Sequence, residues 1–531
     1  MSIIVPGIAL PVEADPQEAI RLAAVRLGWK QGDVKQGSIY RRSVDARRGK
    51  VQLVYSVELI GEGVDEDALA ERFRNASVRV RREVTVSELL ADYTIRPDAD
   101  RPVVVGFGPG GMFAALILAR AGLRPIVLER GDALEQRDGC VERFSVSRSL
   151  DPESNIQFGE GGAGAYSDGK LTTRINDPLC EVVLAELIAH GAPGEIARSA
   201  HPHIGTDLLK NVVRAIRREV IDLGGEVRFR TALTDLRLQS GRLTAAVTSD
   251  GEIGASHLIL ATGHSARDTF ASLLHRGVTL IPKNFAVGVR IEHLQDSIDE
   301  AMLGRYAGDP RLGAAEYSVS NRVEDRGCFS FCMCPGGYLT ASSSEPETVV
   351  TNGMSRHARN GRNGNSALAV SVDASAFGDP LGGVTFARSL ESRAFVLGGG
   401  DYTAPAQLVG DFLADRPSTR GGRVEPTYPL GVRYGKVDEF LPNGGAKLLR
   451  DSLMIFARRH RFFADPDAVL TAPETRTSSP VRLPRGADGR AEGIDGLYPC
   501  GEGAGYAGGI MSAAVDGIKS ALAVLADLSE N

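Results

Sequence analysis

Two cysteines and an arginine–glutamate pair have spacings that could support redox or substrate-binding chemistry. Cys332 and Cys334 are separated by one residue, which on a strand places both thiols on one face, where they could form a redox disulfide or attack an electrophile. Arg290 and Glu292 have the same spacing in VGVRIEH. An arginine there could clamp a substrate carboxylate with two parallel hydrogen bonds. Buried thiols and a structural ion pair remain the alternative interpretation of both patterns.

Further polar candidates lie in segments without a helix or strand pattern. Arg476 belongs to the polar loop ETRTSSP, which could line a pocket. His264 follows an Ala-Thr-Gly turn and could transfer a proton or orient the loop. Lys170 ends the glycine-rich stretch GEGGAGAYSDGK and could approach a cofactor or substrate, or point to solvent.

The clearest element to position such residues is a strand–turn–helix–strand unit. Val103 to Val105 predict a short buried strand, a GxGxxG turn and a helix follow, and a second apolar strand ends on Glu129. The glycines allow a tight turn and let a pyrophosphate approach the helix N-terminus, where N–H groups and the helix dipole favour an anion. An acid after the second strand can accept hydrogen bonds from a ribose. The predicted dinucleotide contacts are Gly106, Gly108, Pro109, Gly110, Gly111, Glu129 and Arg130.

Two further glycine motifs indicate which dinucleotide is bound. LILATG at 258–263 and the C-terminal GLYPCGEGAG…GG, taken with the first unit, resemble the three separated FAD motifs of the glutathione-reductase-type flavoprotein fold. The resemblance implies that Glu502 lies near the ribityl-phosphate part of FAD. It also implies that a helix N-terminus points at the flavin ring and stabilises reduced flavin. The additional contacts that it implies are Ala261, Thr262, Gly263, Gly501, Glu502, Gly508, Gly509 and Ile510.

The glycine-rich stretch at 159–171 permits two interpretations. Gly164 to Lys170 fits the P-loop pattern GxxxxGK, but Leu171 follows where a Ser or Thr should hold magnesium. A P-loop should also directly follow a buried strand, whereas DPESNIQFGE is polar and irregular. We therefore expect these glycines to bring backbone close to the flat flavin ring. The predicted contacts are Gly161, Gly162, Ala163 and Gly164.

The resemblance is closer to one group within that fold. The place of the glycine-rich stretch is similar to that of a flavin-wrapping loop in the fumarate-reductase-like branch. NIQFGEGGAGAYSDGKL, ATGHSARD, FCMCPGG and ETRTSSPVR are similar to signatures of a family of poorly characterised bacterial FAD-dependent dehydrogenases. Those proteins also carry a ferredoxin-like N-terminal domain. The likeness spans essentially the whole chain and implies FAD, but it implies no substrate.

The expected fold class is α/β, with a Rossmann-like FAD-binding domain of the glutathione reductase type. We expect a ferredoxin-like domain at 1–98 and the first part of the FAD-binding domain at 99–270. An inserted α+β substrate or cap domain is expected at 271–464, and 465–531 is expected to complete the FAD-binding domain.

The N-terminal segment alternates strand and helix patterns in the order βαββαβ, with a turn near Arg48-Gly49, which is typical of a ferredoxin-like sandwich. It carries two basic clusters that could dock an acidic protein, such as a redox partner, or RNA. A solvated charged face is the alternative interpretation. The clusters are Arg41, Arg42, Arg47, Arg48 and Lys50, and Arg72, Arg74, Arg79, Arg81 and Arg82.

The composition narrows the class of protein. The 531 residues are 43% hydrophobic and 24% charged, an ordinary globular composition. The net charge of −6 argues against nucleic acid as a partner. No apolar run approaches a membrane span, and the N-terminus lacks a signal-peptide pattern. The six cysteines are too scattered for a disulfide scaffold or a zinc site, so we expect a cytoplasmic protein without a metal.

These observations together predict an FAD-dependent oxidoreductase that transfers hydride between a small organic substrate and FAD. A second GxGxxG is absent, so NAD(P)H would visit the flavin transiently or a protein carrier would serve instead. One alternative is an interaction or electron-relay module that docks a partner through its basic N-terminal domain. A flavin monooxygenase is a further alternative. It is weakened because the only tryptophan is Trp29 and because ATGHSARD stands where aromatic hydroxylases have a DG motif.

Overall fold

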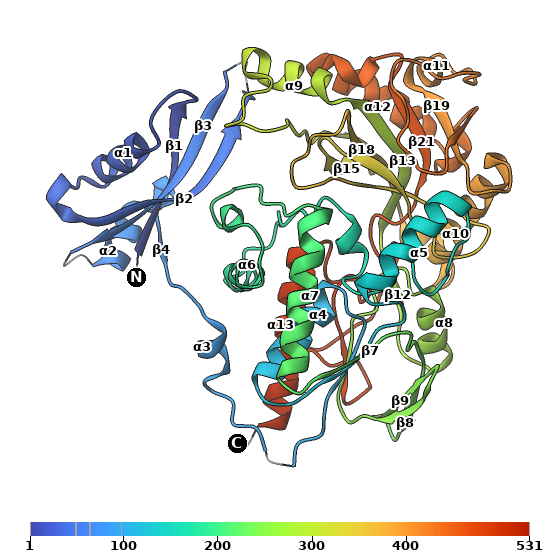
Figure 1. Ribbon diagram of the computed structural model, residues 1–531, viewed down its shortest axis with the longest axis horizontal. Coiled ribbons are helices and arrows are strands. Elements are labelled where there is room, and N and C mark those ends of the chain that lie inside the picture. Colours follow the sequence, from blue (N-terminus) through green and yellow to red (C-terminus); the bar gives the residue numbers. More distant parts are fainter. Residues whose placement is uncertain (1, 48–49, 63–64, 97, 530–531) are drawn as a thin grey trace.

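The computed structural model describes residues 2–47, 50–62, 65–96 and 98–529, so Arg48 and the predicted turn at Arg48-Gly49 lie outside the described residues. Figure 1 shows an N-terminal unit set to one side of a larger body. Among the described residues, no helix is both long enough and apolar enough to cross a membrane.

The N-terminal unit is one antiparallel sheet covered by two helices. Its strands run in the order β2-β3-β1-β4, and every neighbouring pair is antiparallel. Ala19, Ala23 and Leu27 recur at helical spacing on α1 and pack against the sheet in a separate apolar core. The elements are β1 (Ser2–Pro11), α1 (Gln17–Leu27), β2 (Val34–Asp45), β3 (Gln52–Gly61), α2 (Glu66–Arg72) and β4 (Arg79–Arg81). Helix α3 (Val86–Leu90) lies in the connector that follows.

The central domain is built on a five-stranded parallel sheet of order β23-β11-β5-β6-β7. The strands are β5 (Val103–Val105), β6 (Ile126–Leu128), β7 (Glu226–Arg228), β11 (Leu258–Leu260) and β23 (Leu497–Pro499). The three central strands, β11, β5 and β6, are short, apolar and buried, as expected for strands covered on both faces.

Each face of this sheet has its own cover. Val104, Val127 and Ile259 belong to a core with the helices α4 and α13, which run side by side in Figure 1. The alternate residues, such as Val103 and Val105, pack toward the small antiparallel sheet β10-β9-β8 and helix α8. The first face is covered by α4 (Pro109–Arg120), α6 (Leu179–Ala189), α7 (Thr206–Asp222) and α13 (Ile510–Leu528). The second is covered by β8 (Leu233–Gln239), β9 (Arg242–Thr248), β10 (Gly251–Gly254) and α8 (Arg267–His275).

A second, seven-stranded sheet forms the other half of the body, in the order β14-β15-β18-β13-β21-β19-β20. Its strands are β13 (Phe285–Leu294), β14 (Ser320–Val323), β15 (Arg326–Cys334), β18 (Asn363–Val372), β19 (Ala404–Leu408), β20 (Val432–Tyr434) and β21 (Val469–Glu474). Its helices are α9 (Gln295–Leu303), α10 (Gly382–Gly398), α11 (Val409–Leu413) and α12 (Gly445–Arg459). Strand β21 pairs with β13 and β19, so this sheet extends past residue 464, where the sequence predicted the insert to end.

The remaining elements are short. They are α5 (Leu134–Ser147), the strand pair β12 (Ile281–Pro282) and β22 (Val481–Arg482), and the strand pair β16 (Tyr338–Ala341) and β17 (Thr351–Met354).

The N-terminal unit is attached to the body by specific polar contacts. Glu181 on α6 accepts hydrogen bonds from Tyr40 at 2.5 Å and from Arg81 at 2.8 Å. Backbone groups of Arg42 on β2 pair with those of Arg198 and Ala200. One residue of a predicted basic cluster, Arg81, therefore serves an internal interface.

Candidate functional site

One cavity of about 350 Å³ collects the predicted motifs at the carboxyl ends of the parallel strands. The turns after β5, β6, β11 and β23 all open into it, which is where ligands bind in open α/β sheets. The predicted residues that line it are Gly106, Gly108, Pro109, Gly110, Glu129, Arg130, Gly162, Ala163, Gly164, Ala261, Thr262, Gly263, Gly501, Glu502, Gly508, Gly509 and Ile510. Gly111 and Gly161 lie behind this wall.

The turn after β5 is closed by two glycines whose side-chain positions are already filled. Gly106 has φ +93°, and a Cβ on it would lie 2.4 Å from the carbonyl oxygen of Ala261. A Cβ on Gly111 would lie 1.9 Å from the carbonyl oxygen of Gly106. Both glycines are therefore needed to bring α4 against the turn. Gly110, the first residue of α4 that has an N–H group, lines the cavity, and N–H groups in the first turn of a helix have no partner within it.

Glu129 follows β6 at the cavity wall and is held by backbone. Its carboxylate accepts hydrogen bonds from the N–H groups of Phe107, Gly131 and Gly159, each at 2.9 Å. A carboxylate has about four acceptor positions, so one remains for a ligand hydroxyl. Bare glycine backbone, a helix N-terminus and this acceptor together fit the pyrophosphate and ribose of a dinucleotide such as FAD.

The glycine-rich stretch packs on the first turn and does not have the setting of a P-loop. Residues 151–162 form bends and turns where a P-loop requires a strand. The N–H of Gly161 donates to the carbonyl oxygen of Phe107 at 2.8 Å, and a Cβ on Gly162 would lie 3.0 Å from the Cα of Gly108. A Cβ on Gly159 would lie 2.4 Å from the buried side chain of Arg137. Part of the glycine content is therefore explained by close backbone packing rather than by a ligand.

Two titratable groups from different motifs meet near the start of α13. Burial raises the pKa of Glu502 to about 7. Burial, aided by the charge of Arg476, lowers the pKa of His264 to about 3, so this imidazole is neutral. The Nε2 atom of His264 lies 4.0 Å from a carboxylate oxygen of Glu502. Groups whose environments move their pKa values in opposite directions are candidates for proton transfer.

Arg476 lines the cavity and is held by a buried acid. Its guanidinium donates to Glu391 at 3.3 Å through two nitrogens and to Ser344 at 2.5 Å. Glu391, on α10, also binds Arg267 at 2.7 Å. Although burial opposes it, the two arginines lower the pKa of Glu391 to about 2. A charged guanidinium is therefore kept at the cavity in a fixed orientation.

Lys170 also lines the cavity and is not free in solvent. Its ammonium binds Glu316 at 2.6 Å and lies 3.3 Å from Asp168. Burial lowers the pKa of Lys170, but these carboxylates outweigh burial and raise it above the usual value. Asp168 is in turn bound by Arg359. The lysine therefore stands in a charge network that joins the glycine-rich stretch to the loops that hold Glu316 and Arg359.

Arg290 and Glu292 do not line the cavity. Arg290 is fully buried and lies 3.3 Å from Glu474 on the neighbouring strand β21, rather than pairing with Glu292. The carboxylate of Glu292 accepts from Thr427 at 2.6 Å. Arg290 therefore forms a structural ion pair, but its partner is Glu474 on β21 rather than Glu292 on its own strand.

Of the two predicted thiols, Cys332 lines the cavity and Cys334 is buried behind it. The strand β15 is interrupted by a bulge between Phe331 and Cys334, which changes the direction of the side chains there.

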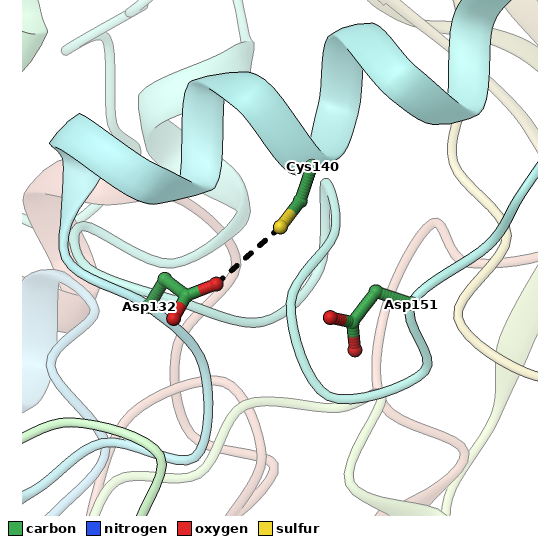
Figure 2. Close-up of side chains that lie close together, drawn as sticks. All are labelled: Asp132, Cys140 and Asp151. Carbon is green, nitrogen blue, oxygen red and sulfur yellow. Dashed lines mark hydrogen bonds between the residues drawn. The ribbon is translucent and has the colours of Figure 1, made fainter.

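A second polar cluster lies outside the cavity. Figure 2 shows Cys140 on α5 above Asp132 and Asp151, which come from the loops on either side of that helix. The Cys140 thiol donates to Asp132 at 3.4 Å. Arg230 binds Asp132 at 2.6 Å and Asp151 at 2.8 Å, so one guanidinium is shared by both carboxylates and offsets part of their charge.

Asp168 and Glu391 are site residues that sequence reasoning missed. Glu391 stands among Ala387, Leu390 and Ala394 on the buried face of α10. An acid on the apolar face of an amphipathic helix is a signal of a buried ion pair, and it was available from the sequence.

The comparisons place part of the chain in a family of FAD-dependent proteins. Residues 284–477, which contain the seven-stranded sheet, match the family model described as "FAD-dependent protein, C-terminal domain-like". A model described as a domain of unknown function matches residues 4–60. An "Uncharacterized protein" of Clostridium beijerinckii is 48% identical over 488 residues, which cover 91% of each chain. The chain belongs to the same family as that protein.

More distant proteins show weaker similarity. Digeranylgeranylglycerophospholipid reductase 2 of Methanococcoides burtonii is 24% identical over 252 residues, which are 45% of this chain and 50% of that protein. A glycine oxidase structure from Geobacillus kaustophilus is 13% identical and covers 82% of this chain and 96% of its own, with a TM-score of 0.33. The structure of the flavin-dependent halogenase CmlS is 14% identical, with a TM-score of 0.37, and the match covers 82% of this chain and 59% of the halogenase. TM-scores this low do not define a shared fold or a shared substrate.

Proposed function

We propose that the chain is an FAD-dependent oxidoreductase that transfers hydride between a small organic substrate and non-covalently bound FAD. NAD(P)H or a protein carrier would serve the other half of the reaction. The observation that carries this proposal is the cavity at the carboxyl ends of the parallel strands. Four glycine-containing segments, at 106–111, 162–164, 261–263 and 501–510, converge on it from distant parts of the chain.

The residues at this cavity suit the parts of FAD. The turn at Gly106–Gly111 and the start of α4 would receive the pyrophosphate, and Glu129 would accept a ribose hydroxyl. The start of α13 would place its positive end near the flavin ring. Strand β11 pairs with β5 next to the first turn. From this pairing and the features above we infer the glutathione-reductase-type arrangement that the sequence predicts.

When bound, FAD would accept or donate the hydride. The chain's own groups would orient the substrate and carry protons. Arg476 and Lys170 bring cationic groups to the cavity, where each is already paired with a carboxylate of the protein. An anionic group on the substrate is the feature that they would bind in addition. Glu502, with a pKa of about 7, can hold or release a proton near neutral pH.

The test begins with flavin content. We expect the purified protein, or the protein reconstituted with FAD, to show flavin absorbance, and NADH or NADPH to bleach it under anaerobic conditions. A metabolite panel rich in carboxylates would then be screened by the same bleaching. Failure to bind FAD after reconstitution would exclude the proposal, and a flavin that neither nicotinamide reduces would exclude the NAD(P)H part alone.

We further infer that the N-terminal unit is a ferredoxin-like module. Its βαββαβ order and antiparallel β2-β3-β1-β4 sheet support this inference. An electron-relay role would use the unit to dock a redox protein. Comparing the full chain with one lacking residues 1–98 separates the two roles. An enzyme keeps flavin reduction by its small-molecule donor, whereas a docking module loses partner binding.

A further inference from the structure

Cys332 and Cys334 form a thiol pair with two different environments. The thiol of Cys334 donates a hydrogen bond to the backbone carbonyl oxygen of Cys332 at 3.4 Å. Cys332 is partly exposed and lines the cavity, whereas Cys334 is completely buried. Redox-active dithiols commonly show this asymmetry. One thiol is accessible to the reaction partner, and the second, resolving thiol is close enough to form the disulfide with it.

The backbone brings the two residues closer than a regular strand would. Phe331 pairs with Ala367 and Cys334 with Asn365, so three residue steps on β15 advance only as far as two on β18. In a regular strand, alternate Cα atoms are about 6.6 Å apart, near the upper end of the range that a disulfide tolerates. The bulge compresses the strand between Phe331 and Cys334, and a shorter span lies further inside that range.

Cys332 itself has an unusual backbone conformation, with φ +46°. Residues other than glycine seldom adopt this region unless the surrounding structure holds them there. Arg290 supplies that hold, since its Nη2 atom donates to the carbonyl oxygen of Cys332 at 2.6 Å and lies 3.5 Å from the sulfur of Cys334. A Cβ on Gly353 would lie 2.3 Å from the same nitrogen, so that glycine is needed to admit the guanidinium.

The electrostatics follow from this geometry. The neighbouring Cys334 thiol lowers the pKa of Cys332, with Arg290 assisting and burial opposing. The neighbouring Cys332 thiol and burial raise the pKa of Cys334 well above its usual value. Of the two thiols, the one at the cavity is therefore the one that deprotonates more readily to a thiolate.

We propose that Cys332 and Cys334 are a redox-active dithiol that exchanges two electrons with the flavin of the same cavity. Arg290 is its positioning residue. The proposal rests on the proposed flavin site and adds to it a second two-electron store within the protein.

The exchange balances without any further reagent. The Cys332 thiolate and the Cys334 thiol form an S–S bond, releasing two electrons and the proton of Cys334. Oxidised FAD accepts the two electrons and that proton and becomes the reduced anion. Run in reverse, reduced FAD delivers two electrons and a proton to the disulfide and regenerates one thiolate and one thiol.

The test counts electrons and thiols in the FAD-reconstituted protein. The protein is oxidised with excess ferricyanide, desalted and titrated anaerobically with dithionite while flavin absorbance is followed. We expect the wild type to take up two more electrons per FAD than C332S or C334S. Alkylation and mass spectrometry should find both cysteines blocked in the oxidised wild type and free in the reduced one.

The control is C180S, which removes a partly exposed thiol on α6, outside the cavity. It should behave as the wild type in both measurements. Equal electron uptake by the wild type and C332S, or alkylation of both thiols after oxidation, would overturn the proposal. Absence of flavin absorbance after reconstitution would instead mean that the proposed function fails. If one serine variant does not fold, the other variant and the wild-type alkylation still decide.

Discussion

The substitution Gly111→Ala tests whether the turn after β5 is the pyrophosphate site. The added Cβ would lie 1.9 Å from the carbonyl oxygen of Gly106, whereas ordinary contact begins near 3.4 Å, so helix and turn must separate by about 1.5 Å. The clash is with backbone, which no side-chain rotation relieves. Overpacking of this kind costs about 1–3 kcal/mol of folding free energy.

The effect on FAD should exceed the effect on folding alone. Displacing the start of α4 removes at least one charge-assisted N–H contact to the pyrophosphate, which is worth about 1.5–3 kcal/mol. That loss corresponds to a roughly 10- to 150-fold higher Kd. Equilibrium dialysis gives Kd directly. Thermal unfolding with and without FAD separates the two effects, because bound ligand adds stability that depends only on its concentration and Kd.

Gly139→Ala is the matched control. Gly139 lies inside α5, has no positive φ and has nothing within 4 Å of the added Cβ, so the substitution should leave Kd unchanged. It should stabilise the helix by roughly 0.5–1 kcal/mol. If G111A bound FAD within about twofold of the wild type while G139A behaved as expected, the assignment of the turn to pyrophosphate would be refuted.

Three further predictions concern charge. The pKa of Glu502 is raised from 4.5 to about 7 in the folded state, so the folded state binds more protons than the unfolded state and the free energy of unfolding falls as pH rises from 4.5 to 7. E502Q should reduce this fall by roughly 3 kcal/mol, as measured by denaturant unfolding at a series of pH values. An unchanged pH slope would contradict the assignment. R81A breaks the half-buried ion pair between Arg81 and Glu181, so it should loosen the N-terminal unit and speed hydrogen exchange in α6. R82A removes the exposed ion pair with Asp67 and should change the exchange rates little. Equal effects of the two variants would argue against the interface. E391A removes the carboxylate that Arg267 and Arg476 share, so it should lower the free energy of unfolding by about 3–5 kcal/mol in a urea titration. A decrease of less than about 1 kcal/mol would contradict the network that holds Arg476.

The sequence was most informative where a local backbone requirement fixes the residue type. A turn that must pass under a neighbouring carbonyl admits only glycine, as at Gly106 and Gly111. The short apolar strands at 103–105, 126–128 and 258–260 could likewise be predicted from their patterns. Their requirements lie within a few residues of each other, so the pattern survives in the linear order.

The candidate catalytic residues depended on pairings between distant strands. The alternation of side chains along β13 places Arg290 and Glu292 on one face of the strand. The register between β13 and β21, however, brings Glu474 next to Arg290 and makes it the partner in the ion pair. The bulge that separates the environments of the two thiols exists only because β15 pairs with β18.

The sequence by itself determined where backbone must pass close to other parts of the protein, because glycine is the only residue that such positions accept. The tertiary structure alone decided which charged and thiol groups reach the cavity. Arg476 and Lys170 line it while Arg290 is buried, although all three were equal candidates in the sequence. The physical reason is that burial and ion pairing are set by neighbours from other elements, and a single strand or loop carries no record of them.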